Sequence, residues 1–254
     1  MKKIIKQWMS VFFLIVVFIV FVLNFDKMKP ALYDFFGMSM SMDTRHSLPK
    51  LTWEHLQVVF YSSFFSVIIG ILLGIYSTTE AGKELRGIFE KVTYLGQMIP
   101  TIAILTFMVS FTGFGAKPAI VALIIFGILP IYVSTVSGIE TIPGDIIEVA
   151  EGIGMNTYQK FKNVILPMAL PVIISGLRTA LIINISAATL SYTVGGGGLG
   201  VLLFSSLKSR NNVFILEGTV TICLLAVIVD RVLKNIEEAL SVYGTLQTKE
   251  NRYG

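Results

Sequence analysis

The feature that most limits how this chain can fold is a series of apolar runs, most of them about 20 residues long, the length at which a helix crosses a bilayer. Their apolar residues follow one another instead of recurring at amphipathic spacing, and only 14% of the 254 residues are charged. The runs occupy Met9–Leu23, Gln57–Ser77, Val92–Thr112, Pro118–Ser137, Met168–Leu190 and Val213–Asp230. The sequence therefore predicts an all-α fold, a polytopic membrane helical bundle of about six transmembrane helices.

The distribution of basic residues predicts the orientation of this bundle, because cytoplasmic loops carry an excess of Lys and Arg. With the N-terminus inside, twelve basic residues are cytoplasmic and seven are outside, a contrast that the long outer loop Asn24–Trp53 lowers without reversing. The cytoplasmic set is Lys2, Lys3, Lys6, Lys83, Arg86, Lys91, Lys160, Lys162, Arg231, Lys234, Lys249 and Arg252; the outer set is Lys27, Lys29, Arg45, Lys50, Lys117, Lys208 and Arg210. We expect a multi-pass protein of the cell (inner or cytoplasmic) membrane with both termini in the cytoplasm.

The first apolar run also has the length and the preceding positive charges of a signal peptide. No cleavage site with small residues follows it, because Leu23 is succeeded by "NFDKMKP". We interpret the run as a retained, slightly short first span, with a cleaved signal as the alternative.

The longest cytoplasmic loop contains the stretch "EVAEGIGMNTYQKFKNVILP", Glu148 to Pro167, which is too polar for a lipid-facing segment. Pro143 suits the start of a helix, and the acids Asp145 and Glu148 suit its positive end. Gly154 can end that helix, and "NTYQKFKNVI" can begin another. The sequence predicts two short helices joined by a glycine bend, facing a soluble partner.

This loop resembles the EAA loop of ATP-binding-cassette importer permeases, whose pattern is E-A-A, three residues, G, nine residues, I, one residue, L-P. The matching positions are Glu148, Val149, Ala150, Gly154, Val164, Leu166 and Pro167. Val149 stands where the pattern has alanine, and Val164 stands where it has isoleucine. Both valines are small and apolar. The resemblance implies a cytoplasmic coupling-helix loop that docks in a separate ATPase subunit; an amphipathic connector on the membrane surface is the alternative.

The resemblance extends over about residues 51–240 and points to the osmoprotectant branch of these permeases, which carries glycine betaine, choline, carnitine or proline. Stretches that carry it include "GQMIPTIAIL", "GLRTALIINISAATLSYTVGGGGLG" and "VDRVLKNIEEAL". We accordingly expect an N-terminal transmembrane helix and outer loop in 1–50, a permease transmembrane domain in 51–240 and a cytoplasmic tail in 241–254.

By this resemblance the chain is the membrane-spanning subunit of an ATP-driven importer and forms the translocation pathway. The partners implied are a cytoplasmic ATPase subunit, an extracytoplasmic substrate-binding protein, a second permease copy or sister permease, and the lipid bilayer. The alternatives are an importer of the same architecture for another small solute, such as an amino acid, and an ATP-independent channel.

A glycine run, "TVGGGGLG", follows the fifth predicted span. Gly195, Gly197 and Gly200 satisfy G-x-G-x-x-G, but the run follows a membrane helix instead of a strand, which argues against a dinucleotide site. A potassium-filter interpretation would need a pore helix before the run. We predict a hinge at the outer end of the span that allows close packing beside the pathway, formed by Gly195, Gly196, Gly197, Gly198 and Gly200.

Polar residues within the fifth predicted span are further candidates. Arg178 lies about ten residues into the span, where a charge costs about 2.5 to 3.5 kcal/mol and should face protein or water. Arg178 can line the pathway, extend to the cytoplasmic surface or pair with acids of the loop. Asn184 and Thr189 can line a polar groove or form hydrogen bonds between helices.

Several chemistries have no support in the sequence. No G-x-x-x-x-G-K-[ST] motif is present, so ATP hydrolysis is expected in a partner chain and this chain is expected to be no enzyme. The scattered basic residues form no nucleic-acid patch, and His46 and His55 without a nearby cysteine make no convincing zinc site. We expect no metal, no cofactor and no nucleic acid bound by this chain.

Overall fold

The computed structural model describes residues 2–39 and 47–253, and all regular secondary structure in these ranges is helical. The elements are α1 Lys2–Phe35, α2 Leu48–Thr78, α3 Glu80–Met98, α4 Thr101–Thr112, α5 Ala116–Glu140, α6 Gly144–Gly152, α7 Thr157–Lys160, a π-helical turn Phe161–Ile165, α8 Leu166–Ala187, a 3-10 segment Ala188–Val194, α9 Gly200–Ser209 and α10 Asn212–Tyr253. His46 lies outside the described residues.

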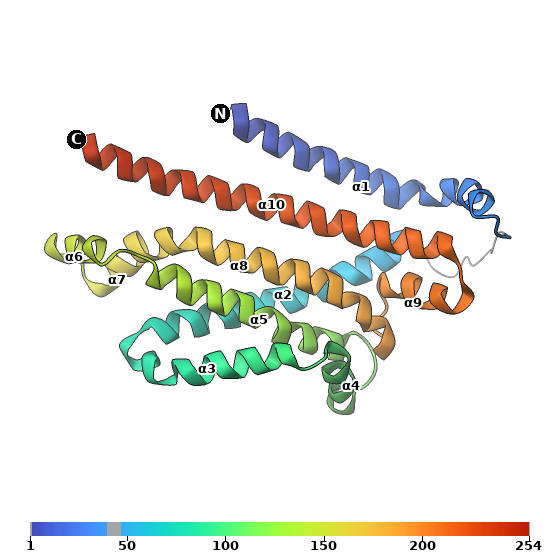
Figure 1. Ribbon diagram of the computed structural model, residues 1–254, viewed down its shortest axis with the longest axis horizontal. Coiled ribbons are helices and arrows are strands. Elements are labelled where there is room, and N and C mark those ends of the chain that lie inside the picture. Colours follow the sequence, from blue (N-terminus) through green and yellow to red (C-terminus); the bar gives the residue numbers. More distant parts are fainter. Residues whose placement is uncertain (1, 40–46, 254) are drawn as a thin grey trace.

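Within these ranges five helices are long and apolar enough to cross a membrane, and a bent pair of helices makes a sixth candidate span. The predicted all-α membrane bundle is therefore confirmed. α5 lies at its centre, packed between α2 and α8, while α10 covers α8 and α1 lies along α10 (Figure 1). Glycines let these helices approach closely: a Cβ added at Gly74 would lie 2.5 Å from Cβ of Thr135.

The predicted third span, Val92–Thr112, is wrong as a single straight helix. α3 and α4 meet at a break where the chain bends by 98°. Pro100 has no N–H to donate, and it holds the preceding residue, Ile99, in an extended conformation with φ −76° and ψ 129°. The apolar run continues across this dipeptide, which is why hydropathy alone did not reveal the bend.

The first span is longer than Met9–Leu23, because α1 continues through the charged segment after Leu23 and through Pro30 to Phe35. That segment is held against the start of α10. Lys29 Nζ lies 3.2 Å from Glu217 Oε1, and Asn211 Nδ2 donates to the Tyr33 hydroxyl over 2.7 Å. The predicted outer loop Asn24–Trp53 is correspondingly too long, since both of its ends are helical.

The last predicted span is also too short, and one helix was missed. α10 passes Asp230 and continues to Tyr253, while α9 occupies part of the segment expected to be an outer loop. α9 packs against α10 and the 3-10 segment. Its apolar stretch is only a few residues long, so it gives no spanning signal.

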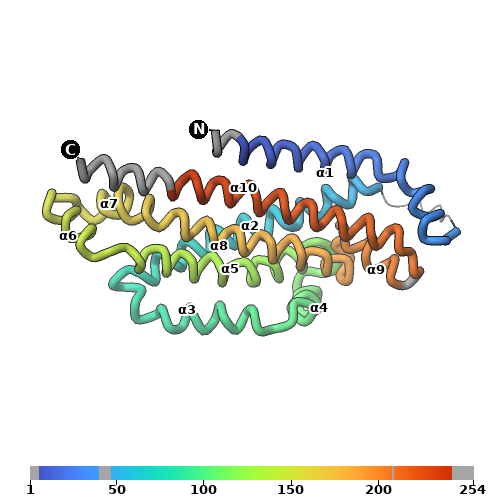
Figure 2. Tube along the Cα trace, turned by 45° about the horizontal axis from the view of Figure 1, so that its top comes forward, coloured from blue at the N-terminus to red at the C-terminus, as the bar shows by residue number. Residues whose placement is uncertain are grey.

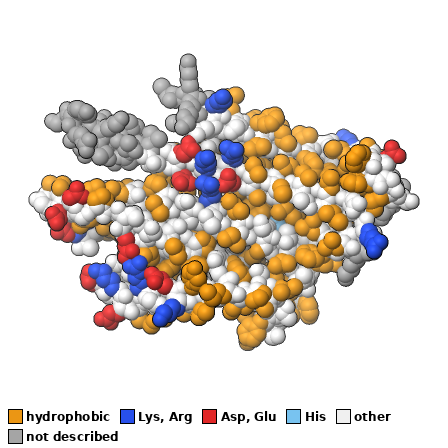
Figure 3. All heavy atoms as spheres, viewed as in Figure 1, with side chains coloured by type: hydrophobic (Ala, Val, Ile, Leu, Met, Phe, Trp, Pro, Cys, Tyr) orange, Lys and Arg blue, Asp and Glu red, His pale blue; other side chains and the backbone are white. Residues whose placement is uncertain are grey.

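The connections gather at two ends of the bundle. α6, α7 and the turn between α2 and α3 lie at the end toward which α10 runs and from which α1 starts (Figures 1 and 2). α4, α9 and the turn after α1 lie at the opposite end. Figure 3 shows hydrophobic side chains over much of the face between these ends, with charged groups toward the α6 end, at the opposite edge and in a cluster near the upper middle of the view.

Candidate functional site

The segment after α5 forms a projection at one end of the bundle, built from α6, a bend at Gly154 and α7 (Figure 1). Pro143 precedes α6, and Asp145 lies in its first turn, where a carboxylate suits the helix dipole. Asn156 caps α7: its Oδ1 accepts from Gln159 N–H, and Gln159 Oε1 accepts from Asn156 N–H, each over 2.9 Å. The predicted first helix and the glycine bend are confirmed, but the second predicted short helix is wrong, because the helix that starts at Thr157 continues into the fifth span.

Gly154 reverses the chain between the two helices. Its φ is +83°, a left-handed conformation that side-chain-bearing residues resist. The Gly154 N–H donates to the Glu151 carbonyl and the Met155 N–H to the Ala150 carbonyl, so the bend also satisfies carbonyls at the end of α6. An added Cβ would meet no atom within 4 Å, so a substitution here strains the backbone without a steric clash.

α7 is not a separate helix but the beginning of the fifth span. The chain passes from α7 through the π-helical turn into α8 without a break. Pro167 has no N–H to donate to the carbonyl four residues earlier, and the wider turn Phe161–Ile165 lies just before it. Val164, Leu166 and Pro167 therefore belong to the helix that supports the projection instead of to its tip.

The tip of the projection presents apolar side chains outside the bundle. Val149 is 64% exposed, and Ile153 and Tyr158 are each 69% exposed. Glu148 is exposed beside them, whereas Ala150 is buried on the inner face of α6. An ion pair between Lys160 and Glu151 braces the two helices. Ile153 and Tyr158 were missed from the sequence, because only the fold shows that they are exposed.

The glycine run at the opposite end forms a compact turn with many internal contacts. Gly195, Gly197 and Gly198 have positive φ, and Gly196 N–H donates to the Ser191 carbonyl over 2.8 Å. Ser191 Oγ donates to the Gly197 carbonyl over 2.9 Å. A Cβ added at Gly200 would overlap the backbone carbonyl of Thr189. The close packing predicted for the run is present, and the hinge remains a prediction.

A carboxylate from another helix reaches this turn. The Gly198 N–H donates to Glu54 Oε2 of α2 over 3.1 Å, and Gly115 N–H, just before α5, donates to the Val194 carbonyl over 2.8 Å. The turn is thus tied to both helices that pack beside it. Glu54 was not singled out in the sequence, because nothing local links it to a segment 144 residues away.

Arg178 bridges α8 to α10. Its Nε donates to Asp230 Oδ1 over 2.6 Å and its Nη1 to Glu237 Oε2 over 3.2 Å. Its side chain is 31% exposed, and its two partners are 30% and 29% exposed. The acids that it pairs with therefore come from the last helix instead of from the loop between α5 and α8, and its place along a pathway remains a prediction.

Asn184 and Thr189 have local or interhelical partners in the structure. Asn184 is fully buried, and its Nδ2 donates to Ser63 Oγ of α2 over 3.1 Å. Thr189 lies in the 3-10 segment and donates to the Ser186 carbonyl over 2.8 Å. The fold does not bring the candidate residues into one centre: the projection and the glycine run are at opposite ends, with Arg178 and Asn184 between them.

Comparison with known proteins agrees with this architecture. The profile of the family described as "Binding-protein-dependent transport system inner membrane component" matches residues 66–242. The choline transport system permease protein of Bacillus subtilis (strain 168) is 35% identical over 199 residues, covering 78% of this chain and 91% of that protein. An osmoprotectant import permease protein of Salmonella typhimurium is 35% identical over 180 residues, covering 71% and 76%.

Among solved structures, an inward-facing methionine ABC transporter matches with a TM-score of 0.71 and 26% identity, covering 79% of this chain and 99% of that one. The family accounts for a bundle of spanning helices without an enzymatic centre, and it implies an ATPase subunit and a partner permease. The chain therefore belongs to the binding-protein-dependent transport system inner membrane components, the multi-pass permease subunits of ABC transporters.

Proposed function

We propose that this permease imports small osmoprotectants bearing an ammonium group, such as choline, glycine betaine or carnitine. The relatives that are about 35% identical over most of their length are named for these solutes, and this identity supports the proposal. The likeness to a methionine transporter is weaker at 26% identity, and it keeps an amino acid as the second candidate substrate.

The observation that carries the transport mechanism is the apolar tip of the α6–α7 projection. Apolar side chains exposed at the tip of a projecting loop mark a surface for a protein partner. Val149, Ile153 and Tyr158 provide that surface, flanked by the acids Glu148 and Glu151. We assign it to the ATPase subunit, whose closure on ATP would move the projection and change the access of the helices behind it.

The proposed orientation places α6 and both ends of the chain in the cytoplasm. The excess of Lys and Arg on that side supports it, as does the common end of the bundle at which these segments lie. An extracytoplasmic binding protein would deliver solute at the opposite end, beside the glycine run. We assign ATP binding and hydrolysis to the ATPase subunit and no cofactor to this chain. The roles of Arg178 and the glycine run in the pathway remain predictions.

The first experiment tests the coupling surface in proteoliposomes that contain the permease, its ATPase subunit and the binding protein. Gly154→Asp forces a side chain into a left-handed bend, and Ile153→Asp removes an apolar contact without straining the backbone. We expect either change to abolish uptake and to reduce co-purification of the ATPase subunit, at normal amounts of permease in the membrane.

Gly144→Asp is the matched control, since it adds the same charge to the same segment at a helix start that favours acids and has open space around it. It should leave uptake near normal. Full transport and an unchanged yield of complex in both test variants would remove the projection from the coupling role. Competition of labelled choline uptake by glycine betaine and by methionine then separates the two candidate substrates.

A further inference from the structure

A cavity lies between α3 and α5, separate from the projection and the glycine run. Its volume is about 390 Å³, within the range of small-ligand sites. It lies along the middle of α3 and the second half of α5, up to the end of that helix. Side chains that define its chemistry are Arg86, Glu90, Tyr94, Tyr132, Ser137 and Glu140.

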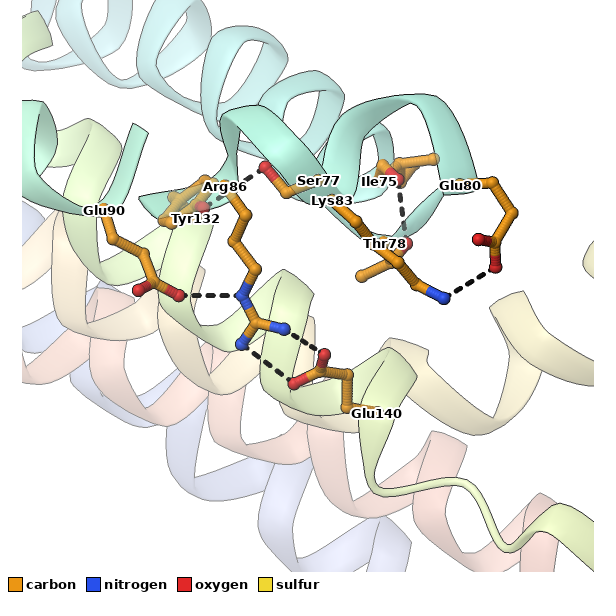
Figure 4. A network of polar contacts seen from close by, with 9 residues as sticks. All are labelled: Ile75, Ser77, Thr78, Glu80, Lys83, Arg86, Glu90, Tyr132 and Glu140. Carbon is orange, nitrogen blue, oxygen red and sulfur yellow. Dashed lines mark hydrogen bonds and ion pairs between the residues drawn. The ribbon is translucent and has the colours of Figure 1, made fainter. Parts of the chain in front are cut away.

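The charged groups of this cavity form an ion cluster with a negative excess. Arg86 Nη2 lies 3.0 Å from Glu140 Oε2, Nη1 of the same guanidinium donates to the other oxygen, and Nε lies 2.9 Å from Glu90 Oε1 (Figure 4). One guanidinium thus faces two carboxylates, so the described residues that line the cavity carry one net negative charge. Because Glu90 and Glu140 are each nearly half exposed, a second cation can approach them.

Aromatic rings stand beside these carboxylates. Tyr94 is 59% exposed and follows Glu90 by one helical turn, while Tyr132 is fully buried and its hydroxyl donates to Ser77 Oγ over 3.2 Å. Tyr94 is therefore the ring that an occupant can contact, and a tyrosine ring next to an unbalanced carboxylate favours a cation that carries alkyl groups, since the ring attracts its charge.

We propose that this cavity binds the ammonium group of a small organic cation or zwitterion inside the permease itself. The choice of solute rests on the proposed function, whereas the site rests on the cavity, the charge excess and the exposed ring of Tyr94. Glu140 is the last residue of α5, and α6 begins at Gly144, so an occupant of the cavity would lie directly beside the start of the projection.

The test measures choline binding to the full chain in lipid nanodiscs, with 3,3-dimethylbutan-1-ol as the uncharged probe of the same shape. Choline should bind and the alcohol should not. Glu90→Gln removes the excess charge but keeps the Arg86–Glu140 pair, and it should weaken choline binding about 5-fold. Tyr94→Leu keeps an apolar side chain without the ring, and it should weaken binding about 3-fold.

Glu84→Gln is the control, because Glu84 is exposed on the same helix and does not line the cavity. Equal binding of choline by wild type, Glu90→Gln and Tyr94→Leu, or equal binding of choline and the alcohol, would overturn the proposal. Since binding is measured on the permease alone, that failure is distinct from a failure of ATPase coupling or of uptake.

A lipid headgroup can supply the same ammonium chemistry at a membrane boundary. Nanodiscs of pure phosphatidylglycerol and nanodiscs that contain phosphatidylethanolamine separate the two sources. Equal choline binding in both assigns the site to a free solute, while weaker binding with phosphatidylethanolamine, a difference between the two lipids that Glu90→Gln abolishes, assigns it to the headgroup. Either result retains the ammonium site.

Discussion

Single residues matter most in this protein where the backbone allows no side chain. Gly154 and Gly200 illustrate two different reasons. Gly154 has a left-handed φ in open space, so its role is to bend the projection. Gly200 begins α9 against the carbonyl of Thr189, so its role is to let two backbone segments approach each other. The first glycine shapes the projection, and the second permits close packing.

The packing role of Gly200 predicts a loss of stability on alanine substitution that a glycine in open space should not show. Gly200→Ala inserts a methyl group into a backbone contact and should lower the free energy of unfolding by about 1–3 kcal/mol. Gly144→Ala, exposed in open space, should change it by less than about 0.5 kcal/mol. Thermal unfolding of the purified variants in detergent measures both, and an unchanged midpoint for Gly200→Ala would contradict the packing role.

At the scale of elements, α1 is fastened to α10 by polar contacts within an apolar interface. Lys29 is 15% exposed and Glu217 only 1% exposed as side chains, and Asp26 also contacts Lys29 Nζ over 2.6 Å. No hydrogen bond of good geometry reaches the Glu217 oxygens in the described part of the chain, so attraction between the opposite charges is the main contact. Removing one charge leaves the other buried without compensation.

Lys29→Met is therefore expected to destabilise the protein by about 3–5 kcal/mol, whereas Lys29→Met combined with Glu217→Met should recover much of that loss. Lys27→Met is the matched control, because Lys27 is exposed on the same helix and its ammonium group donates to the neighbouring Asn24 Oδ1 over 2.8 Å. Chemical unfolding of the wild type, Lys29→Met, Glu217→Met and the double variant gives the coupling energy, with Lys27→Met measured alongside. Additive losses would show that the pair does not fasten α1.

For the whole molecule, the arrangement of the spans fixes which segments share a side of the membrane. α6, the start of α1 and the far part of α10 lie at one end, and the turn after α1 lies at the other (Figure 1). If the helices cross the bilayer as a bundle, the side of one segment determines the side of all the others. The orientation can therefore be tested at two positions.

We expect a green fluorescent protein fused after Gly254 to fluoresce, and alkaline phosphatase inserted after Gly37 to be active. Green fluorescent protein fluoresces in the cytoplasm, and alkaline phosphatase is active outside it. The control for each reporter is the same reporter at the other position, where it should be inactive. Phosphatase activity after Gly254 would reverse the proposed orientation and would move the projection away from the ATPase.

Local information in the sequence determined a large part of this protein. Hydropathy over about 20 residues identifies a spanning helix, so the all-α membrane bundle was predicted correctly. Caps and left-handed glycines depend on neighbouring residues, so α6, Gly154 and the start of α7 were also predicted. The residues that fit the EAA pattern lie close together along the chain, which made the projection recognisable without coordinates.

Only the tertiary structure decided what depends on contacts between distant residues. Lys29 pairs with Glu217, Arg178 with Asp230, and Arg86 with Glu140, and in each case the partner lies on another helix. Those contacts let charged segments remain helical, which is why α1 and α10 exceed their predicted lengths. Hydropathy scores each residue by its own transfer energy, whereas the cost of a charge within the bundle depends on the group that lies opposite it.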